Sequence, residues 1–291
     1  MTVSGSVTGI RKLAWMMVAV LEICTFQAAG QTPRETGPDD NAGSQNQSQP
    51  GSDSTTGRTK NQGSAKSKSA VRRDRPGFYM GRRIADVMSW EGVDWLFRET
   101  RINEEEPEAM LDALEIPPGA TVADVGAGAG YHSIRLARRV GPKGTVLASD
   151  IQPEMLRMLE TNARSVGVTN IKPIRSTQSD PKLPADSVDL ILMVDVYHEC
   201  SKPEVTLQGL LKALKPRGRL VLVEFRGEDD EVPIKPEHKM TLKQVRREVE
   251  PQGYDFKESL EFLPWQHIII FEKPGDPKTA TSPPPAHTPE P

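Results

Sequence analysis

The chain has 291 residues, a formal net charge of -3, 36% hydrophobic residues and a mean hydropathy of -0.50. The near-neutral charge gives no global argument for binding nucleic acid, and we expect no nucleic-acid partner. Two cysteines are too few for a disulfide framework or a cysteine-rich zinc site. The low hydrophobic content indicates that part of the chain does not fold.

The first 30 residues have the order of a secretory signal peptide. Arg11 and Lys12 precede an apolar run over residues 13–21, and small residues follow at positions 28–30. The run is short for a membrane span. A cleaved signal, an uncleaved anchor and a misassigned start site all remain open. We expect export or membrane tethering in the first two cases and a cytoplasmic location in the third.

Residues 31–75 are predicted to be a disordered linker. No large apolar side chain occurs between positions 31 and 70, so nothing offsets the entropy cost of ordering this segment. The segment 58–83 carries nine basic residues and one acid, and is either a solvated linker or a patch for anionic lipid or nucleic acid. The tail 274–291 has seven prolines and is predicted to be disordered as well. One domain remains, residues 76–273.

Residues 76–118 are predicted to form a helical lid ahead of the first core strand. Glu104, Glu105 and Glu106 favour a helix N-terminus electrostatically. In a doubly wound sheet, ligands bind beyond the carboxyl ends of the strands, so an extension at this place can cover them.

Apolar runs and helical stripes then alternate over residues 119–273. This alternation predicts a doubly wound α/β fold, with a mostly parallel seven-stranded sheet, helices on both faces and an antiparallel closing strand. The expected strands are 120–125, 144–150, 170–175, 188–194 and 218–225, with a closing pair at 254–262 and 266–271; the expected helices are 131–140, 153–166, 203–214 and 240–249.

A glycine-rich turn follows the first strand, with Gly126, Gly128 and Gly130 leading into a helix. Glycines there let the backbone turn tightly near a ligand, and the helix N-terminus offers free N–H groups. The dinucleotide pattern G-x-G-x-x-G fails, because its third glycine would fall on Tyr131. Asp124 would repel a pyrophosphate but can accept a hydrogen bond from an ammonium group. An NAD-dependent oxidoreductase is therefore disfavoured.

Asp150 ends the second strand, where a carboxylate can accept from both hydroxyls of a ribose. That role suits S-adenosylmethionine and NAD equally, so Asp150 alone does not discriminate between them.

Four segments together resemble the motifs of Rossmann-like (class I) S-adenosylmethionine-dependent methyltransferases of the small-molecule type. They are 122–130, 148–155, 183–189 and 214–222, in order and at normal spacing. The resemblance covers residues 121–225. It implies S-adenosylmethionine as cofactor and methyl transfer to a small-molecule acceptor, and it says little about which acceptor. A protein that binds the cofactor without turnover is the main alternative.

Site residues are carried over from this resemblance by position. Either Gln178 or Asp180 would meet the adenine amino group, because the local run Ser176–Asp180 departs from the common form. The other implied residues are Asp124, Gly126, Ala127, Gly128 and Gly130 at the methionine end, Asp150 at the ribose, Ile151 at the adenine, and Asp195 near the donor methyl.

The run Asp195–Glu199 follows the fourth strand and holds the candidate catalytic residues, Asp195 and His198. His198 either acts as a general base near neutral pH or, with Glu199, only caps the loop. His132 is expected to pack on the cofactor side. No set of His, Cys, Asp and Glu has metal-ligand spacing, so no metal is predicted.

Two further groups are candidates for an acceptor site. Lys235, His238 and Lys239 either bind an anionic acceptor or lie on a solvated connection. The extension carries side chains that either line an acceptor pocket or pack against the core: Trp90, Trp95 and Arg98. The oligomeric state stays open.

Overall fold

The computed structural model describes residues 75–275. The expected signal peptide, nearly all of the linker with most of its basic segment, and the tail beyond residue 275 lie outside the described residues. Within the described part, no helix combines the length and apolar character that a bilayer span needs.

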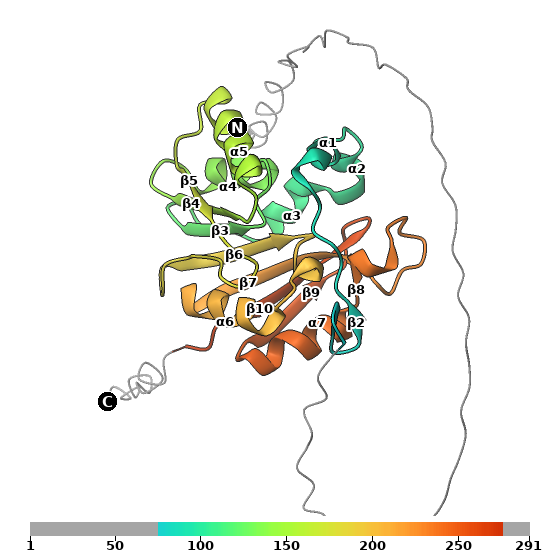
Figure 1. Cartoon of the computed structure of the whole chain (residues 1–291). Coiled ribbons are helices and arrows are strands. Elements are labelled where there is room, and N and C mark those ends of the chain that lie inside the picture. Colours follow the sequence, from blue (N-terminus) through green and yellow to red (C-terminus); the bar gives the residue numbers. More distant parts are fainter. Residues whose placement is uncertain (1–74, 276–291) are drawn as a thin grey trace, which may run out of the picture. The chain divides into compact units, whose positions relative to one another are not determined.

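Seven strands form the main path of one sheet in the order β5-β4-β3-β6-β7-β10-β9 (Figure 1). The first five are parallel, while β10 pairs antiparallel with both β7 and β9. A short strand, β8, pairs with the end of β7. The predicted mostly parallel sheet with an antiparallel end is confirmed. The strands are β3 (Thr121–Val125), β4 (Thr145–Asp150), β5 (Ile171–Arg175), β6 (Val188–Val194), β7 (Leu214–Arg226), β8 (Lys239–Met240), β9 (Asp255–Leu260) and β10 (Gln266–Glu272).

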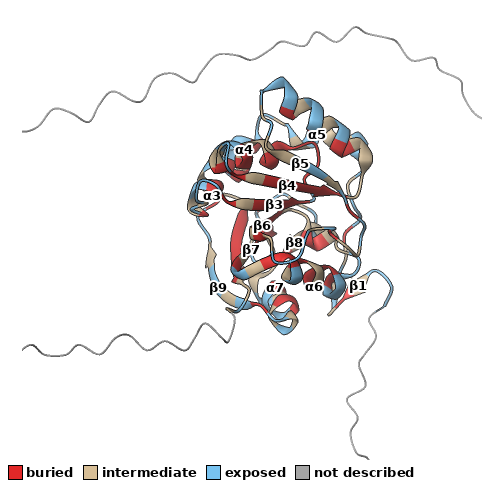
Figure 2. Cartoon of the chain, turned by 90° about the vertical axis from the view of Figure 1, so that its left-hand side faces the viewer, coloured by how far each residue is buried: buried red, intermediate tan, exposed pale blue. Residues whose placement is uncertain are grey.

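Alternate residues of the central strands pack into two separate hydrophobic cores, one on each face of the sheet. On β6, Leu190 and Leu192 join one apolar cluster, whereas Ile191 and Met193 join the other. This follows from the period of two along a strand, and because both faces are covered the strand is apolar throughout. Figure 2 shows the central strands as largely buried and the outer helix faces as exposed.

Helices cover both faces of the sheet. Helices α3 and α4 pack on the face that holds Leu190, and α6 and α7 pack on the opposite face. Helix α4 begins after Gly130 and ends before Gly141, both at positive φ. The core helices are α3 (Pro107–Ala113), α4 (Tyr131–Val140), α5 (Pro153–Ser165), α6 (Pro203–Ala213) and α7 (Leu242–Val249), with 3-10 turns η2 (Tyr197–Glu199), η3 (Pro236–His238) and η4 (Glu250–Gln252).

The predicted N-terminal helices are present, but their boundaries differ from the expectation. Glu104 and Glu105 close a short helix instead of opening one, and Glu106 takes a left-handed conformation (φ 43°) before Pro107. Proline disfavours a helical conformation in the residue before it, so α2 ends there and α3 begins at Pro107. The extension comprises β1 (Phe78–Tyr79), β2 (Arg82–Arg83), η1 (Trp90–Gly92), α1 (Val93–Leu96) and α2 (Arg101–Glu105).

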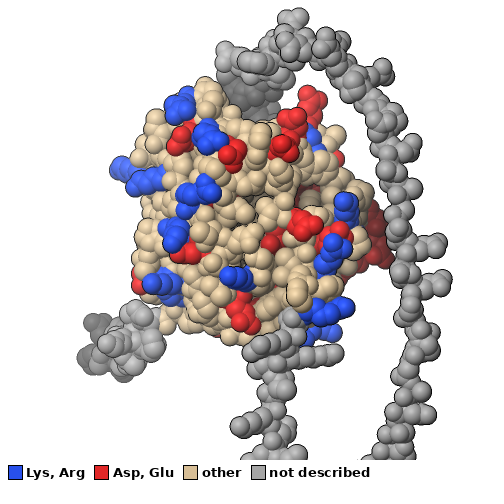
Figure 3. All heavy atoms as spheres, in the orientation of Figure 1, with Lys and Arg blue, Asp and Glu red and all other residues tan. Residues whose placement is uncertain are grey.

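The segment between the β1–β2 pair and α1, residues 84–92, passes along the carboxyl edge of the sheet (Figure 1). We call this segment the strap. It joins the side of the fold that carries α7 to the side that carries α4 and α5. On the face seen in Figure 3, basic and acidic side chains are interspersed and neither sign dominates.

Candidate active site

A cavity of about 580 Å³ lies at the carboxyl ends of β3, β4 and β6. Its volume falls in the range of small-molecule sites, and its place is the one where ligands bind in doubly wound sheets. The strap and the short helices α1 and α2 supply part of its wall. Of the residues predicted for the site, those that line the cavity are Gly126, Gly128, Asp150, Ile151, Gln178, Asp195 and His198.

The glycine turn forms one end of the cavity. Gly126 and Gly128 have φ of 75° and 52°, in the left-handed region that favours glycine. A Cβ on Gly128 would come within 2.9 Å of Leu96 Cδ1, and a Cβ on Gly126 would collide with the side chain of Val196. The turn therefore has no space for side chains at these two positions.

Asp124, Ala127 and Gly130 do not line the cavity, which differs from their expected place at the methionine end. Asp124 accepts a hydrogen bond from Ser133 Oγ at 2.6 Å and so ties β3 to the first turn of α4. Burial raises its pKa to about 6. Ala127 packs in a small apolar cluster, and a Cβ on Gly130 would meet Leu159. These three residues support the turn outside the cavity lining.

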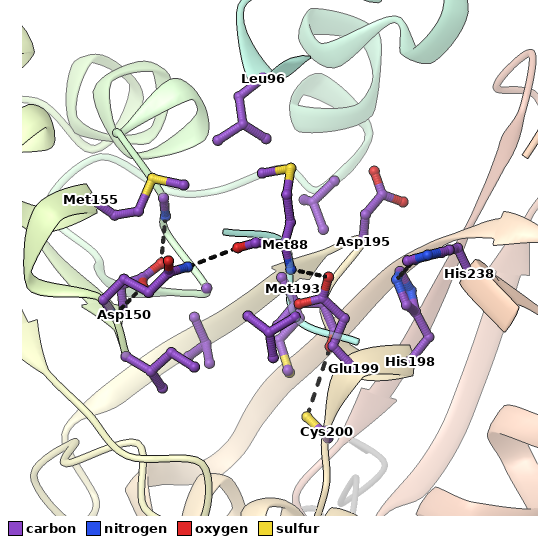
Figure 4. Close-up of a pocket in the computed structure, with 18 of the residues that line it drawn as sticks. Met88, Leu96, Asp150, Met155, Met193, Asp195, His198, Glu199, Cys200 and His238 are labelled. Atoms are coloured by element: carbon purple, nitrogen blue, oxygen red, sulfur yellow. Dashed lines mark hydrogen bonds between the residues drawn. The ribbon is translucent and has the colours of Figure 1, made fainter. Parts of the chain in front are cut away.

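Asp150 stands at the end of β4 with its carboxylate at the cavity (Figure 4). Oδ2 accepts from the Gly128 N–H and Oδ1 from the Gln152 N–H, both at 2.8 Å. Burial raises the pKa of this carboxyl, while those two N–H groups oppose the rise. A carboxylate has about four acceptor positions over its two oxygens, so the group can accept further hydrogen bonds from a ligand. A carboxylate at this place fits the two hydroxyls of a ribose.

Ile151 lies next to Asp150 on the cavity wall, and Gln178 approaches from the loop after β5. Gln178 Oε1 accepts from Ser201 Oγ at 3.0 Å. Asp180, the other candidate for the adenine contact, lies outside the cavity and pairs with Lys182 at 2.7 Å. The geometry favours Gln178 over Asp180.

Asp195 follows β6 in a left-handed conformation, with φ of 55°. A non-glycine residue rarely adopts this conformation, and such strain concentrates at functional sites. Its two carboxylate oxygens accept from Gln266 Nε2 at 2.9 and 2.8 Å. Burial, together with the nearby charge of Glu105, raises the pKa of Asp195 well above its usual range.

His198 is almost fully buried, and its ring is held at both nitrogens. Nδ1 lies 2.6 Å from Glu224 Oε2, and Nε2 lies 3.1 Å from His238 Nδ1. Burial alone would lower the pKa of His198, but the Glu224 carboxylate outweighs it and raises the pKa. Burial and the neighbouring His198 charge lower the pKa of His238.

Glu199 also faces the cavity, and its Oε1 accepts from the Met88 N–H of the strap at 3.3 Å. Burial raises the pKa of this carboxyl to about 7. The strap is also held by Gln152, whose side chain contacts Met88 O at 2.9 Å and Trp90 N at 2.8 Å.

Among the other candidates for an acceptor site, Trp95, Lys235 and His238 line the cavity. Lys239 instead donates to Asp229 O at 2.8 Å. The candidates that lie outside the lining are Trp90, Arg98, His132 and Lys239.

His132 is buried behind the cavity. Its Nε2 lies 3.2 Å from Arg101 Nη2. Burial, followed by the Arg101 charge, lowers its pKa well below the usual range.

Sequence reasoning missed Glu224 and Gln266, which hold the two candidate catalytic residues. Both are fully buried polar side chains on apolar strands. An acid inside the run Leu220–Phe225 is a signal that could have been read, because buried carboxylates are rare unless they are paired. The fold also assembles His198, Glu199 and His238, which spacing along the chain did not suggest.

The glycine turn, the strand-end carboxylate and the sheet order are those of a Rossmann-like domain with a ligand cavity at the carboxyl edge of its sheet. A family model described as a methyltransferase domain matches residues 116–266, which are 151 of the 291 residues. The chain belongs to this family. Members of this family use S-adenosylmethionine as methyl donor. The residues found around Asp150 fit this cofactor.

The chain is 30% identical over 116 residues to the ubiquinone/menaquinone biosynthesis C-methyltransferase UbiE of Citrobacter koseri. The match covers 40% of this chain and 46% of that protein, so the chain spans about half the length of the curated relatives it matches. The UbiE protein of Salmonella arizonae is 29% identical over the same length, with the same coverage.

The solved structures that are similar to this one include a methyltransferase and a cyclase. A SAM dependent methyltransferase from Aquifex aeolicus has a TM-score of 0.61 at 27% identity, covering 64% of this chain and 99% of that chain. The [4+2]-cyclase SpnF has a TM-score of 0.51 at 14% identity, covering 59% of this chain and 81% of that one. The second likeness concerns the fold alone.

Proposed function

We propose that residues 76–273 transfer a methyl group from S-adenosylmethionine to a small-molecule acceptor. One observation carries this proposal: a single cavity has Gly128 and Asp150 at one end and Asp195, His198 and His238 at the other. In this proposal the donor and the acceptor share that one cavity. Alignment of the two reactants in such a space is the main demand of methyl transfer.

At the donor end, Asp150 would hold the ribose, Ile151 would pack on the adenine and Gln178 would meet the adenine edge. When bound, S-adenosylmethionine supplies an electrophilic methyl group. The acceptor's electron pair forms the new bond to carbon, the carbon–sulfur pair stays on sulfur, and the acceptor's proton leaves to a base or to water.

At the acceptor end, we assign Asp195 and His198 to the acceptor. Because Glu224 accepts the hydrogen on Nδ1, the basic nitrogen of His198 is Nε2, which lies 3.1 Å from His238 Nδ1 at the acceptor end of the cavity. That nitrogen can take a proton from the acceptor or bind a cation. The UbiE relatives are named as C-methyltransferases of quinone biosynthesis, which supports a small organic acceptor. The cavity continues past Asp195, so space for an acceptor is present. This disfavours the alternative of a protein that binds S-adenosylmethionine without transferring its methyl group.

Titration calorimetry with S-adenosylhomocysteine and, separately, with NAD tests the donor site. We expect S-adenosylhomocysteine to bind, and Asp150→Ala to weaken it by about 1–3 kcal/mol, the range for a lost hydrogen-bonded charge. Asp180→Ala is the matched control, because that acid lies outside the cavity. Unchanged affinity in folded Asp150→Ala would refute the ribose role, and binding of NAD alone would overturn the cofactor.

We also propose that residues 1–30 export or tether the chain, and that residues 31–75 and 274–291 flank the domain as unstructured segments. The charge and apolar pattern of residues 11–21 supports the first part. N-terminal sequencing of the mature protein distinguishes cleavage near position 30 from an intact anchor. A cytoplasmic product that begins at an internal methionine would contradict both.

A further inference from the structure

Three side chains with metal-binding atoms meet at the acceptor end of the cavity. His198 and Glu199 lie on η2, and His238 is the last residue of η3. One ligand atom of each lies within 4.8 Å of the other two. All three side chains line the cavity, and Figure 4 shows His198 and His238 side by side with Glu199 next to them.

The orientation of His198 is the one expected of a metal ligand. Glu224 Oε2 accepts from its Nδ1 at 2.6 Å, and the other oxygen of Glu224 accepts from the Tyr197 N–H at 2.8 Å. The proton is thereby held on Nδ1, and the lone pair of Nε2 points away from Glu224. Ligating histidines nearly always have such a carboxylate or carbonyl partner on the second nitrogen.

The backbone of the same turn is fixed from the other side. The carbonyl of His198 accepts from the Ala85 N–H at 3.1 Å and from Arg82 Nη1 at 2.9 Å. Because both the ring and the backbone of His198 are fixed, this histidine loses little conformational freedom when it binds an ion. The site is therefore pre-organised.

The second histidine faces the first across a short gap. His198 Nε2 and His238 Nδ1 are 3.1 Å apart, and the two rings meet edge to face at 83°. Two neutral imidazole nitrogens cannot face each other with lone pairs alone, so a proton or a cation must lie between them. Two nitrogens bound at about 2.0–2.1 Å to one tetrahedral ion are about 3.3–3.4 Å apart, so a small movement of His238 from its present 3.1 Å admits the ion.

We propose that His198, Glu199 and His238 bind one divalent transition-metal ion of the Zn²⁺ type at the acceptor end of the cavity. Two imidazoles and one carboxylate are a donor set that suits zinc and its neighbours. Three protein ligands leave a coordination position open, and that position faces the cavity. This proposal departs from the prediction of no metal, which rested on spacing along the chain.

The open position indicates the chemical class of the acceptor, and this step rests on the proposed function. An ion there binds an oxygen, nitrogen or sulfur atom of the acceptor and favours its deprotonated form. His198 is then a ligand and not the general base. Lys235 also lines this end of the cavity, and its ammonium group adds a second positive charge beside the ion.

The test uses the full-length protein, freed of metal with a chelator and titrated with Zn²⁺ in a calorimeter. We expect one ion per chain. Adding Co²⁺ instead is expected to give visible absorption bands of a low-coordinate site. His238→Ala changes a partly exposed residue at the end of η3 and is expected to fold and to lose binding by at least 100-fold. Glu224→Gln, which removes the carboxylate behind His198, is expected to lower affinity about 10–100-fold.

Glu231→Gln is the matched control, because it removes an exposed acid from the same loop, outside the cluster. Its Zn²⁺ affinity is expected to equal that of the wild type. Absence of 1:1 binding, or equal binding by His238→Ala, overturns the site and leaves a plain hydrogen bond between the histidines. S-adenosylhomocysteine binding is measured in parallel, so failure of the donor site is distinguished from failure of the metal site.

Discussion

Asp124 is a carboxylate with hardly any contact with water. It is 3% exposed, its partner is the hydroxyl of Ser133, and burial raises its pKa to about 6. In the unfolded chain an aspartate titrates near pH 3.9. The native state therefore holds the proton more tightly than the unfolded state, and between these two values stability falls as the pH rises.

Asp124→Asn is expected to remove this dependence. A rise of two pKa units corresponds to about 3 kcal/mol, so the unfolding free energy of the wild type relative to the variant should fall by that amount between pH 3.5 and 7. Urea denaturation of both proteins across this range measures the difference. A difference that is constant with pH would show that Asp124 titrates normally in the folded state.

Residues adjacent to a strand end could be predicted from the sequence. Asp150 and Gly128 are of this kind, because the end of an apolar run places them at the ligand edge. The acid inside an apolar run marks Glu224 as unusual, but the partners of Glu224 and Gln266 could not be predicted, because they depend on register: the Asp195 N–H donates to Val223 O, and Gln266 pairs with Phe225. Nothing local in the sequence sets these alignments.

At the scale of elements, the strap is held against the sheet edge by a single side chain on one side of the cavity. Gln152 accepts from the Trp90 N–H and donates to Met88 O. Its position just after Asp150 couples the strap to the strand that carries the candidate ribose acid.

Gln152→Ala is expected to loosen the strap while leaving the sheet intact. Two hydrogen bonds worth about 0.5–1.5 kcal/mol each are lost, so amide hydrogen exchange over residues 86–92 should speed up about 5- to 150-fold. Gln208→Ala is the control, because that amide bonds only to Gln252 on an exposed surface. Equal exchange over residues 86–92 in the wild type and Gln152→Ala would show that other contacts hold the strap.

For residues 119–273 the order of strands and helices could be predicted apart from the short strand β8 and the early start of β7, since apolar period and glycine and proline positions are local properties. The extension was harder. Its helices α1 and α2 are four and five residues long, too short to show a hydrophobic period. Three acids in a row suggested a helix start, but a helix ends there, at Glu105, and Glu106 is left-handed.

For the molecule as a whole, one buried network joins the start of the described chain to its C-terminal half. Arg82 donates to both oxygens of Glu248 at 2.8 and 3.1 Å, and Tyr197 Oη donates to the same carboxylate at 2.8 Å. Glu248 is fully buried on α7. The partners are up to 166 residues apart, so no pattern in the sequence predicted their contact.

Arg82→Ala leaves that carboxylate without its cation. Removal of one partner of a buried ion pair costs about 3–5 kcal/mol, and we expect the unfolding free energy to fall by this amount. Arg83→Ala, on the exposed neighbour, is expected to change it by less than about 0.5 kcal/mol. Equilibrium urea unfolding measures both variants, and similar midpoints for the two would contradict the role of the network.

The strap is held at several points along its length. Gln152 contacts Met88 O and Trp90 N, Glu199 accepts from the Met88 N–H, and the Ala85 N–H donates to the His198 carbonyl. Lifting the strap from the sheet edge therefore requires several hydrogen bonds to break together. In an enzyme whose spent nucleoside leaves past this segment, the interval between turnovers would depend on how often those bonds break and not on bond making alone.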